Sequence, residues 1–128
     1  MKLNIRKLDI KKDTRGWLAE LILAKDVGGK KFGQLGVTVA RPGQIKGGHY
    51  HRRKREWFCV IRGTGLLTFK SIKTGETKEL GIGENNMILV EIPKLHYHWI
   101  KNVGKSDMYL LFYTNEVFNP KDTDTFNE

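Results

Sequence analysis

The sequence predicts an all-β fold closed into a small sandwich or barrel, and three observations support this prediction. Short runs rich in Val, Ile, Leu, Phe, Tyr and Thr recur along the chain, separated by glycine-containing turn signals. No window of about 11 residues has a helical period of apolar residues. All four histidines lie in two segments, as pairs two residues apart, so both imidazoles of each pair point to one face of a strand.

The predicted strands are short and end at turn signals such as Arg41-Pro42-Gly43 and Lys73-Thr74-Gly75-Glu76. Continuous apolar residues, as in Met87 to Val90, indicate strands that are covered on both sides. About nine or ten strands in a chain of this length are typical of a jelly roll, which removes unpaired sheet edges. In chain order the expected strands are Trp17 to Ala24, Gly33 to Ala40, Glu56 to Arg62, Gly65 to Ile72, Asn86 to Ile92, His96 to Val103 and Met108 to Asn115. The polar tail from Asn119 to Glu128 is expected to be irregular.

The length of 128 residues fits one domain with a single core, so we expect residues 1–128 to form one domain. No apolar run approaches the ~20 residues that cross a bilayer. The start, Met1 to Lys7, lacks the apolar stretch of a signal peptide. We therefore expect a cytoplasmic protein without a membrane partner. The single cysteine, Cys59, lies in an apolar run and is expected to be a small buried hydrophobe.

The formal charge of +9, from 23 basic and 14 acidic residues, favours anionic partners. The dense basic run Arg52 to Arg55 lies between His51 and Glu56. It has two interpretations: a solvated hairpin tip, or a positive collar that attracts phosphates to a pocket. Nucleic acid is the least favoured partner, because the chain has no recognition helix and no aromatic–basic stripe.

The two histidine segments match a known pair of motifs. Gly43 to Gly63 satisfies the first cupin motif, G-x5-H-x-H-x4-E-x6-G, and Pro93 to Asn102 resembles the second, P-x-G-x2-H-x3-N, with Leu95 in place of the glycine. The chain is therefore identified as a member of the cupin superfamily. This resemblance implies an all-β, double-stranded β-helix (cupin jelly-roll barrel) with its metal ligands on the inner surface.

The cupin resemblance assigns four metal ligands, namely His49, His51, Glu56 and His98. Imidazole nitrogens with one carboxylate oxygen suit a divalent ion, with Zn²⁺ expected first and Fe, Mn or Ni as alternatives. His96 shares a strand face with His98 but lies outside the motif spacing, so we expect it at the mouth of the site. The alternative is that these residues are polar side chains that face water inside the barrel mouth.

A closer resemblance covers nearly the whole chain. Asp13 to Glu20 looks like the opening D-x-R-G-x-x-x-E of nucleotide-sugar cupins, which include dTDP-4-keto-6-deoxyglucose 3,5-epimerases and ketoisomerases. Phe118 to Phe126 looks like the C-terminal cupin domain of CapF-type capsular polysaccharide UDP-sugar epimerase/reductases. The implied function is epimerisation at C3 and/or C5, or isomerisation, of a 4-keto-6-deoxy nucleotide sugar for surface polysaccharide synthesis. Family habit also implies a homodimer.

Two further roles stay open. The chain has no G-x-G-x-x-G that follows a strand, so any reduction belongs to another protein. A non-catalytic cupin that holds a metal and a sugar nucleotide beside a separate reductase is therefore the main alternative to an enzyme. A quercetinase-like dioxygenase uses the same ligand set, but the basic collar argues against its uncharged substrates.

The resemblance also implies roles for individual residues. His49 falls where the 3,5-epimerases have a base, yet a metal-bound His49 cannot also accept a proton, so the two roles exclude each other. If His49 binds metal, the base is sought among His96, Tyr50, Tyr97 and Tyr113. The candidate for the family's aromatic acid is Tyr113 or Tyr109. The catalytic candidates are His49, His96 and Tyr113. The substrate-binding candidates are Arg15, Gln34, Lys46 and Arg53, because cationic side chains suit phosphates and Gln34 matches a polar family position.

Overall fold

A computed structural model describes residues 1–14, 16–28 and 32–127 of the protein, which are almost entirely strands and turns. The one helical element is the 3-10 turn η1 (Ala24–Val27) among these described residues. The strands are β1 (Asn4–Lys7), β2 (Lys11–Asp13), β3 (Gly16–Leu18), β4 (Gln34–Ala40), β5 (Ile45–His49), β6 (Glu56–Arg62), β7 (Thr64–Ser71), β8 (Thr77–Gly83), β9 (Ile88–Ile92), β10 (His96–Asn102) and β11 (Met108–Thr114).

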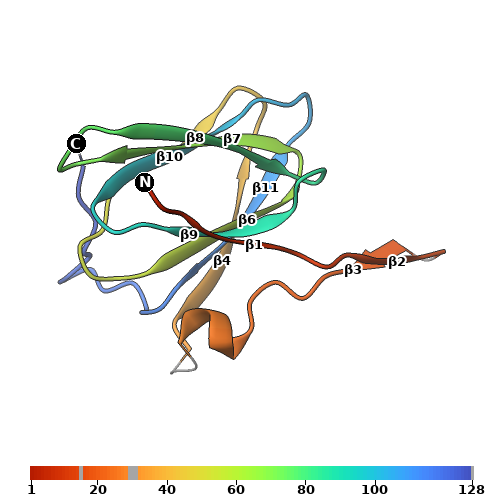
Figure 1. Ribbon diagram of the computed structural model, residues 1–128, viewed down its shortest axis with the longest axis horizontal. Helices are drawn as coiled ribbons and strands as arrows, with labels where there is room; N and C mark the ends of the chain where they lie inside the picture. The colour runs from red at the N-terminus through yellow and green to blue at the C-terminus, as the bar shows by residue number, and fades with distance from the viewer. Residues whose placement is uncertain (15, 29–31, 128) are drawn as a thin grey trace.

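Two antiparallel sheets face each other and enclose the interior (Figure 1). One sheet has the order β1-β9-β6-β11-β4 and the other the order β5-β10-β7-β8. The short hairpin of β2 and β3 forms a separate sheet that extends away from the barrel (Figure 1). The predicted all-β class and jelly-roll barrel are confirmed.

Apolar side chains form two clusters, one on each face of the five-stranded sheet. The inner cluster fills the space between the sheets and includes Phe58, Val60, Leu67, Phe69 and Ile100. The outer cluster is made by alternate residues of the same strands together with the segment before η1, and its buried members are Leu8, Trp57, Cys59, Met87, Leu89 and Tyr113. The central strands β6 and β9 are thus covered on both faces, as the continuous apolar runs predicted, whereas the outer side of the edge strand β4 is exposed.

The predicted strand from Trp17 to Ala24 is wrong over most of its length. The strand ends at Leu18, and the chain then runs without regular structure into η1. Side chains satisfy the backbone here, since the Asp26 carboxylate accepts the Leu23 N–H at 2.8 Å and Arg6 donates to the Leu21 carbonyl at 2.7 Å. Such side-chain bonds compete with a strand ladder, so apolar composition alone was misleading.

Strands β1, β2 and β5 were not predicted, and neither was β8. Its residues Thr77, Lys78 and Glu79 are polar and exposed, and its last three residues, Gly81 to Gly83, carry a turn signal. Pairing with β7 over the full length of β8 makes it a strand. The other predicted strands agree with β4, β6, β7, β9, β10 and β11 to within one or two residues at each end. Within the described residues, no helix has the length and apolar character needed to cross a bilayer.

Candidate metal centre

The fold brings His49, His51, Glu56 and His98 together. His49 ends β5 and lies directly opposite His98 of β10 in the ladder, while Glu56 begins β6 in the facing sheet. The candidate ligand atoms of the four residues all lie within 4.8 Å of one another. His51, Glu56 and His98 are buried, and His49 is half-buried. The predicted convergence of the two histidine segments is therefore present in the barrel.

Backbone carbonyls orient two of the three imidazoles. His51 Nδ1 lies 2.7 Å from the carbonyl oxygen of Asp124, and His98 Nδ1 lies 3.1 Å from that of His96. A carbonyl can only accept, so each Nδ1 carries the hydrogen and donates it. The lone pair of a neutral ring is then on Nε2. Both Nε2 atoms face the same oxygen of Glu56, at 3.3 Å from His51 and 3.1 Å from His98.

This arrangement of donor atoms fits a divalent metal ion. Two nitrogen lone pairs and a carboxylate oxygen repel one another unless a cation, either a proton or a metal ion, lies among them. Ligand atoms placed about 2.0–2.2 Å from one ion are roughly 3.0–3.5 Å apart, which matches the two Nε2–Oε1 distances. Three imidazoles and one carboxylate suit Zn²⁺ and the other transition ions named above.

Burial and neighbouring charge set the protonation of two of these groups. Burial, helped by the nearby His98, lowers the pKa of His49 to about 4. Burial opposes ionisation of Glu56, but N–H donation and positive charge from protonated His51 and His98 outweigh this effect and lower the pKa of Glu56 to about 2. At neutral pH His49 is therefore uncharged and Glu56 is a carboxylate, the forms that bind metal.

His96 lies two residues before His98 and on the same face of β10. Its ring is half-buried, and Nδ1 lies 2.8 Å from the Lys94 carbonyl oxygen, so Nε2 carries the lone pair of the neutral ring. Tyr97 alternates with these two histidines and therefore faces the other side of the sheet. Tyr50 stacks on Phe126 with ring centroids 5.4 Å apart.

Two predicted substrate-binding residues share the inner face with the ligands. Lys46 is opposite Ile100 in the β5–β10 ladder, and Ile100 belongs to the inner cluster. Thr114 of β11 pairs with Glu56 of β6 on one side and with Gln34 of β4 on the other. Gln34 therefore lies on the same face of the sheet as Glu56, two strands away. The side-chain oxygen Oε1 of Gln34 accepts the Phe118 N–H at 2.9 Å. Arg15 lies outside the described residues.

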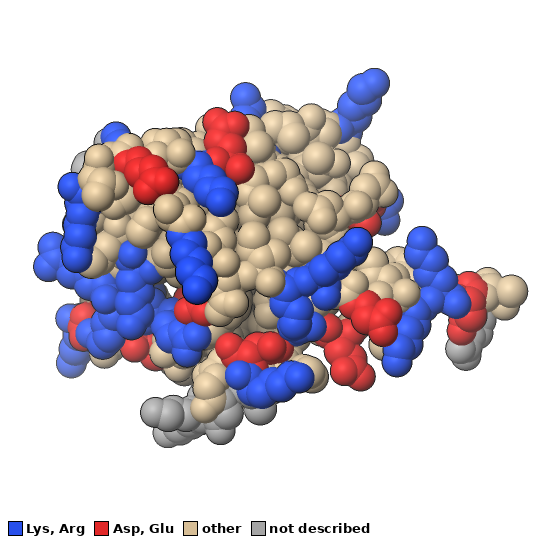
Figure 2. Space-filling view, viewed as in Figure 1, with Lys and Arg blue, Asp and Glu red and all other residues tan. Residues whose placement is uncertain are grey.

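The basic run between His51 and Glu56 is bound to the rest of the protein. Arg53 forms ion pairs with Glu116 at 2.6 Å and Asp122 at 3.1 Å, and a phosphate would compete with both. Arg55 pairs with Glu91 at 2.8 Å. Figure 2 shows Lys and Arg gathered on the side where the C-terminus lies in Figure 1, with Asp and Glu among them. These contacts oppose the predicted role of Arg53 in binding phosphate.

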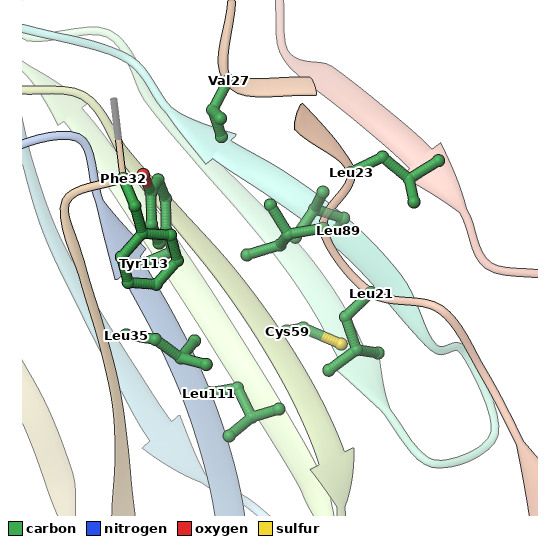
Figure 3. Close-up of a pocket in the computed structure, with 10 residues that line it drawn as sticks. Leu21, Leu23, Val27, Phe32, Leu35, Cys59, Leu89, Leu111 and Tyr113 are labelled. Carbon is green, nitrogen blue, oxygen red and sulfur yellow. The ribbon is translucent and has the colours of Figure 1, made fainter. Parts of the chain in front are cut away.

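The prediction that Tyr113 supplies an acid inside the barrel is wrong. Tyr113 is opposite Trp57 in the β11–β6 ladder, whereas the adjacent Thr114 is opposite Glu56. Successive residues of a strand point to opposite faces, so Tyr113 lies on the outer face. It is 1% exposed, and its hydroxyl accepts the Gly33 N–H at 2.8 Å. Tyr113 lines an apolar cavity of about 480 Å³ whose lining residues include none of the four histidines. Figure 3 shows Tyr113 among the apolar side chains of that cavity.

Sequence reasoning missed Asp124, whose carbonyl oxygen binds His51. The residue is buried, although the tail around it is polar. The tail contains the acidic residues Asp122 and Asp124, and the basic run lies some 70 residues earlier in the chain. This complementary pair of charged segments was the signal available in the sequence.

The fold and the converging motif residues define a cupin. A family model described as the polysaccharide biosynthesis C-terminal domain matches residues 11–126, so the chain belongs to that family. The chain is 36% identical over 114 residues to the UDP-2-acetamido-2,6-beta-L-arabino-hexul-4-ose reductase of Pseudomonas aeruginosa, with 89% of this chain and 29% of that protein covered. It is 30% identical over 125 residues to the spore coat polysaccharide biosynthesis protein SpsL of Bacillus subtilis, with 94% of this chain and 83% of SpsL covered.

Solved structures agree with this assignment. The capsular polysaccharide assembling protein CapF from Staphylococcus aureus superposes with a TM-score of 0.74 at 32% identity, covering 94% of this chain and 34% of CapF. A dTDP-6-deoxy-D-glucose-3,5-epimerase from Legionella pneumophila has the same fold, with a TM-score of 0.80 at 20% identity over 98% of this chain and 71% of that chain. The predicted place among nucleotide-sugar cupins of the CapF type is confirmed. The chain spans about a third of the length of the reductase and of CapF.

Proposed function

We propose that the protein is a metal-binding cupin that transfers protons on a 4-keto-6-deoxy nucleotide sugar, epimerising C3 and/or C5 or isomerising the sugar, in surface polysaccharide biosynthesis. The observation that supports the proposal is the buried group of His49, His51, Glu56 and His98 in a cupin barrel of a polysaccharide-synthesis family. The Pseudomonas relative is named for its action on a hexul-4-ose, a sugar with its ketone at C4.

The chemistry requires a base and a way to stabilise an enolate. A ketone at C4 acidifies the protons at C3 and C5, and removal of one of them needs a base within hydrogen-bond reach. When bound, a divalent ion supplies Lewis-acid stabilisation of the enolate oxygen. His49, His51, Glu56 and His98 would hold that ion through nitrogen and oxygen lone pairs.

We assign the base to His96. A metal-bound His49 cannot take a proton, and its pKa of about 4 makes it a weak base at neutral pH. His96 shares the face of His98 and has the Nε2 lone pair that proton abstraction requires. Delivery of a proton from solvent to the opposite face of the sugar, with release to solvent of the proton held by His96, would complete an epimerisation. Lys46, on the inner face three residues before His49, is placed to attract the substrate's diphosphate.

Solvent exchange tests the catalytic proposal. The protein is incubated in heavy water with a UDP- or dTDP-4-keto-6-deoxysugar, and deuterium at C3 and C5 is followed by NMR. We expect incorporation with the wild type and a loss of at least about 100-fold in rate with His96→Asn, the usual size of a general-base contribution. Tight binding of such sugars without exchange would instead support the non-catalytic module that acts beside a separate reductase.

Metal analysis tests the ligand set independently of turnover. Protein purified without added metal is expected to contain about one divalent ion per chain, and Zn²⁺ is the ion that we expect. His51→Ala removes one nitrogen ligand and should leave little bound metal, whereas Lys46→Ala should leave the content unchanged. A wild type that neither retains nor takes up Zn²⁺ would contradict the metal proposal.

We also propose that two copies associate through the outer side of the five-stranded sheet. Strand β4 is an edge strand, and its alternate residues Leu35, Val37 and Val39 are 54%, 58% and 39% exposed. On the projecting hairpin, Trp17 and Leu18 are 52% and 59% exposed. A long apolar edge strand is a ready site for pairing between chains, so a second copy is the partner that we expect.

A further inference from the structure

The loop that carries His51 depends on contacts with the C-terminal segment. It runs from Tyr50 to Arg55, between the end of β5 and the start of β6, and so lies outside the regular ladders. A ligand on such a loop needs other contacts to hold its ring in place. Residues 122–126, which we call the tail segment, form hydrogen bonds with backbone groups of Tyr50, Arg52, Arg53 and Lys54 in this loop.

Asp124 contacts the loop through its side-chain carboxylate and through its backbone carbonyl oxygen. Its carboxylate accepts three consecutive backbone N–H groups, from Arg52 at 3.1 Å, Arg53 at 2.8 Å and Lys54 at 2.7 Å. Its own carbonyl oxygen accepts the Nδ1–H of His51 at 2.7 Å. Asp124 is 5% exposed and has a left-handed backbone with a φ of 46°. Asp adopts this conformation more readily than most residues other than glycine, so the backbone here is compatible with the contacts on both of its polar groups.

Further contacts attach the tail segment on both sides of Asp124. Phe126 and Tyr50 exchange two backbone hydrogen bonds of 3.0 Å each, and their rings stack. The Arg52 guanidinium lies 4.6 Å from the centre of the Phe126 ring. On the other side, Arg53 pairs with Asp122 at 3.1 Å. The tail segment is therefore bound along its whole length to the loop that carries the metal ligand.

We propose that Asp124 is a positioning residue that makes metal binding depend on the tail segment; this inference rests on the proposed metal site. Its carboxylate fixes the loop, and its carbonyl keeps the hydrogen of His51 on Nδ1, so that the Nε2 lone pair faces Glu56 and the ion. Loss of the carboxylate frees both the loop and the ring. Contacts that orient a ligating histidine typically change metal affinity by about 10–100-fold.

The test measures Zn²⁺ affinity of the metal-free protein by competition with a chromophoric chelator. Asp124→Ala is expected to weaken Zn²⁺ binding by at least about 10-fold. The matched control Asp107→Ala removes an exposed carboxylate on the loop between β10 and β11 and should leave the affinity unchanged. Asp124→Asn, which keeps the shape but loses the charge, should fall between the two. Equal affinities of wild type and Asp124→Ala would overturn the inference.

A second measurement separates this inference from the proposed metal site. Long-range ¹⁵N–¹H NMR on metal-free protein reports which nitrogen of His51 carries the hydrogen. We expect a hydrogen on Nδ1 of His51 in the wild type, with or without a second one on Nε2, and loss of the Nδ1 hydrogen from part of the molecules in Asp124→Ala. If the wild type binds no Zn²⁺, the metal proposal fails, but the NMR result still decides the role of Asp124. An unchanged His51 tautomer in Asp124→Ala overturns the positioning role of Asp124. Asp124→Asn is used in the same way if Asp124→Ala does not fold.

Discussion

Leu95 occupies the position where the second cupin motif has glycine, and its backbone explains why that motif uses glycine. Its φ is 59°, in the left-handed region that glycine adopts most easily. The Leu95 N–H donates to the His51 carbonyl at 2.8 Å, and the Leu95 carbonyl accepts the Ile72 N–H at 3.1 Å. The chain therefore keeps the backbone of the motif with a different residue, at a steric cost of about 1–2 kcal/mol.

Substitutions at Leu95 test this reading. Leu95→Gly removes the steric cost, whereas Leu95→Val adds a β-branched side chain that tolerates a positive φ poorly. We expect the free energy of unfolding of Leu95→Val to be about 1–2 kcal/mol below that of Leu95→Gly. Urea unfolding followed by circular dichroism measures the difference. Equal midpoints for the two variants would show that the backbone at residue 95 is not left-handed.

Cys59 should behave as an inert core residue. It is 1% exposed, and burial raises the pKa of its thiol to about 11, so the reactive thiolate is scarce at pH 8. We expect Ellman's reagent to modify it only when urea unfolds the protein. As a control, Ser106→Cys in a Cys59→Ala background places a thiol on an exposed loop and should react at once. Comparable native-state rates for the two proteins would contradict the burial of Cys59.

At the scale of elements, the ion pair between Arg55 and Glu91 connects three parts of the five-stranded sheet. Glu91 of β9 accepts from Arg55, just before β6, at 2.8 and 3.0 Å, and from Asn4 of β1 at 3.0 Å. Burial opposes ionisation of Glu91, but these hydrogen bonds outweigh it and lower its pKa. The pair holds the edge strand β1 and the first residue of β6 to β9.

The lowered pKa of Glu91 predicts a specific pH dependence. The ion pair stabilises the fold above the ordinary glutamate pKa of about 4.3, and the contribution is lost as the pH falls through the lower value of the folded state. The free energy of unfolding is measured by urea at pH 6 and at pH 3. Its fall between the two pH values should be about 0.5–1 kcal/mol smaller in Glu91→Gln than in the wild type. Glu79→Gln, at an exposed position on β8, should lose as much stability as the wild type. If the free energy of unfolding of Glu91→Gln fell as much as that of the wild type, the ion pair between Arg55 and Glu91 would not stabilise the fold.

At the scale of the whole molecule, the exposed apolar residues of β4 predict a dimer. The wild type should have a mass near 29.6 kDa, twice the 14.8 kDa of the chain, by light scattering after gel filtration. Val37→Lys places a charge in the middle of the β4 surface and should shift the protein to the monomer at the same concentration. Thr77→Lys, on the edge strand β8 of the other sheet, should remain dimeric. A wild type of 14.8 kDa at micromolar concentration would contradict the proposed association.

The sequence by itself determined the fold class, the boundaries of six strands to within two residues and the four residues that converge in the barrel. β6 and β10 agree with their predicted ranges because the composition of a strand and its turn signals are local properties of the chain. The convergence of His49, His51, Glu56 and His98 was predictable because the two cupin motifs specify a fold in which their strands are neighbours.

The tertiary structure alone decided which faces and partners the remaining residues have. The sequence alone does not tell which of Tyr113 and Thr114 points into the barrel. Only the register of β11 against β6 places Thr114 inside and Tyr113 outside. Arg53 meets Glu116 and Asp122, and Asp124 meets His51, across more than 60 residues of chain. Local patterns carry no information about such contacts, because strand register and long-range hydrogen bonds are set only when distant segments pack together.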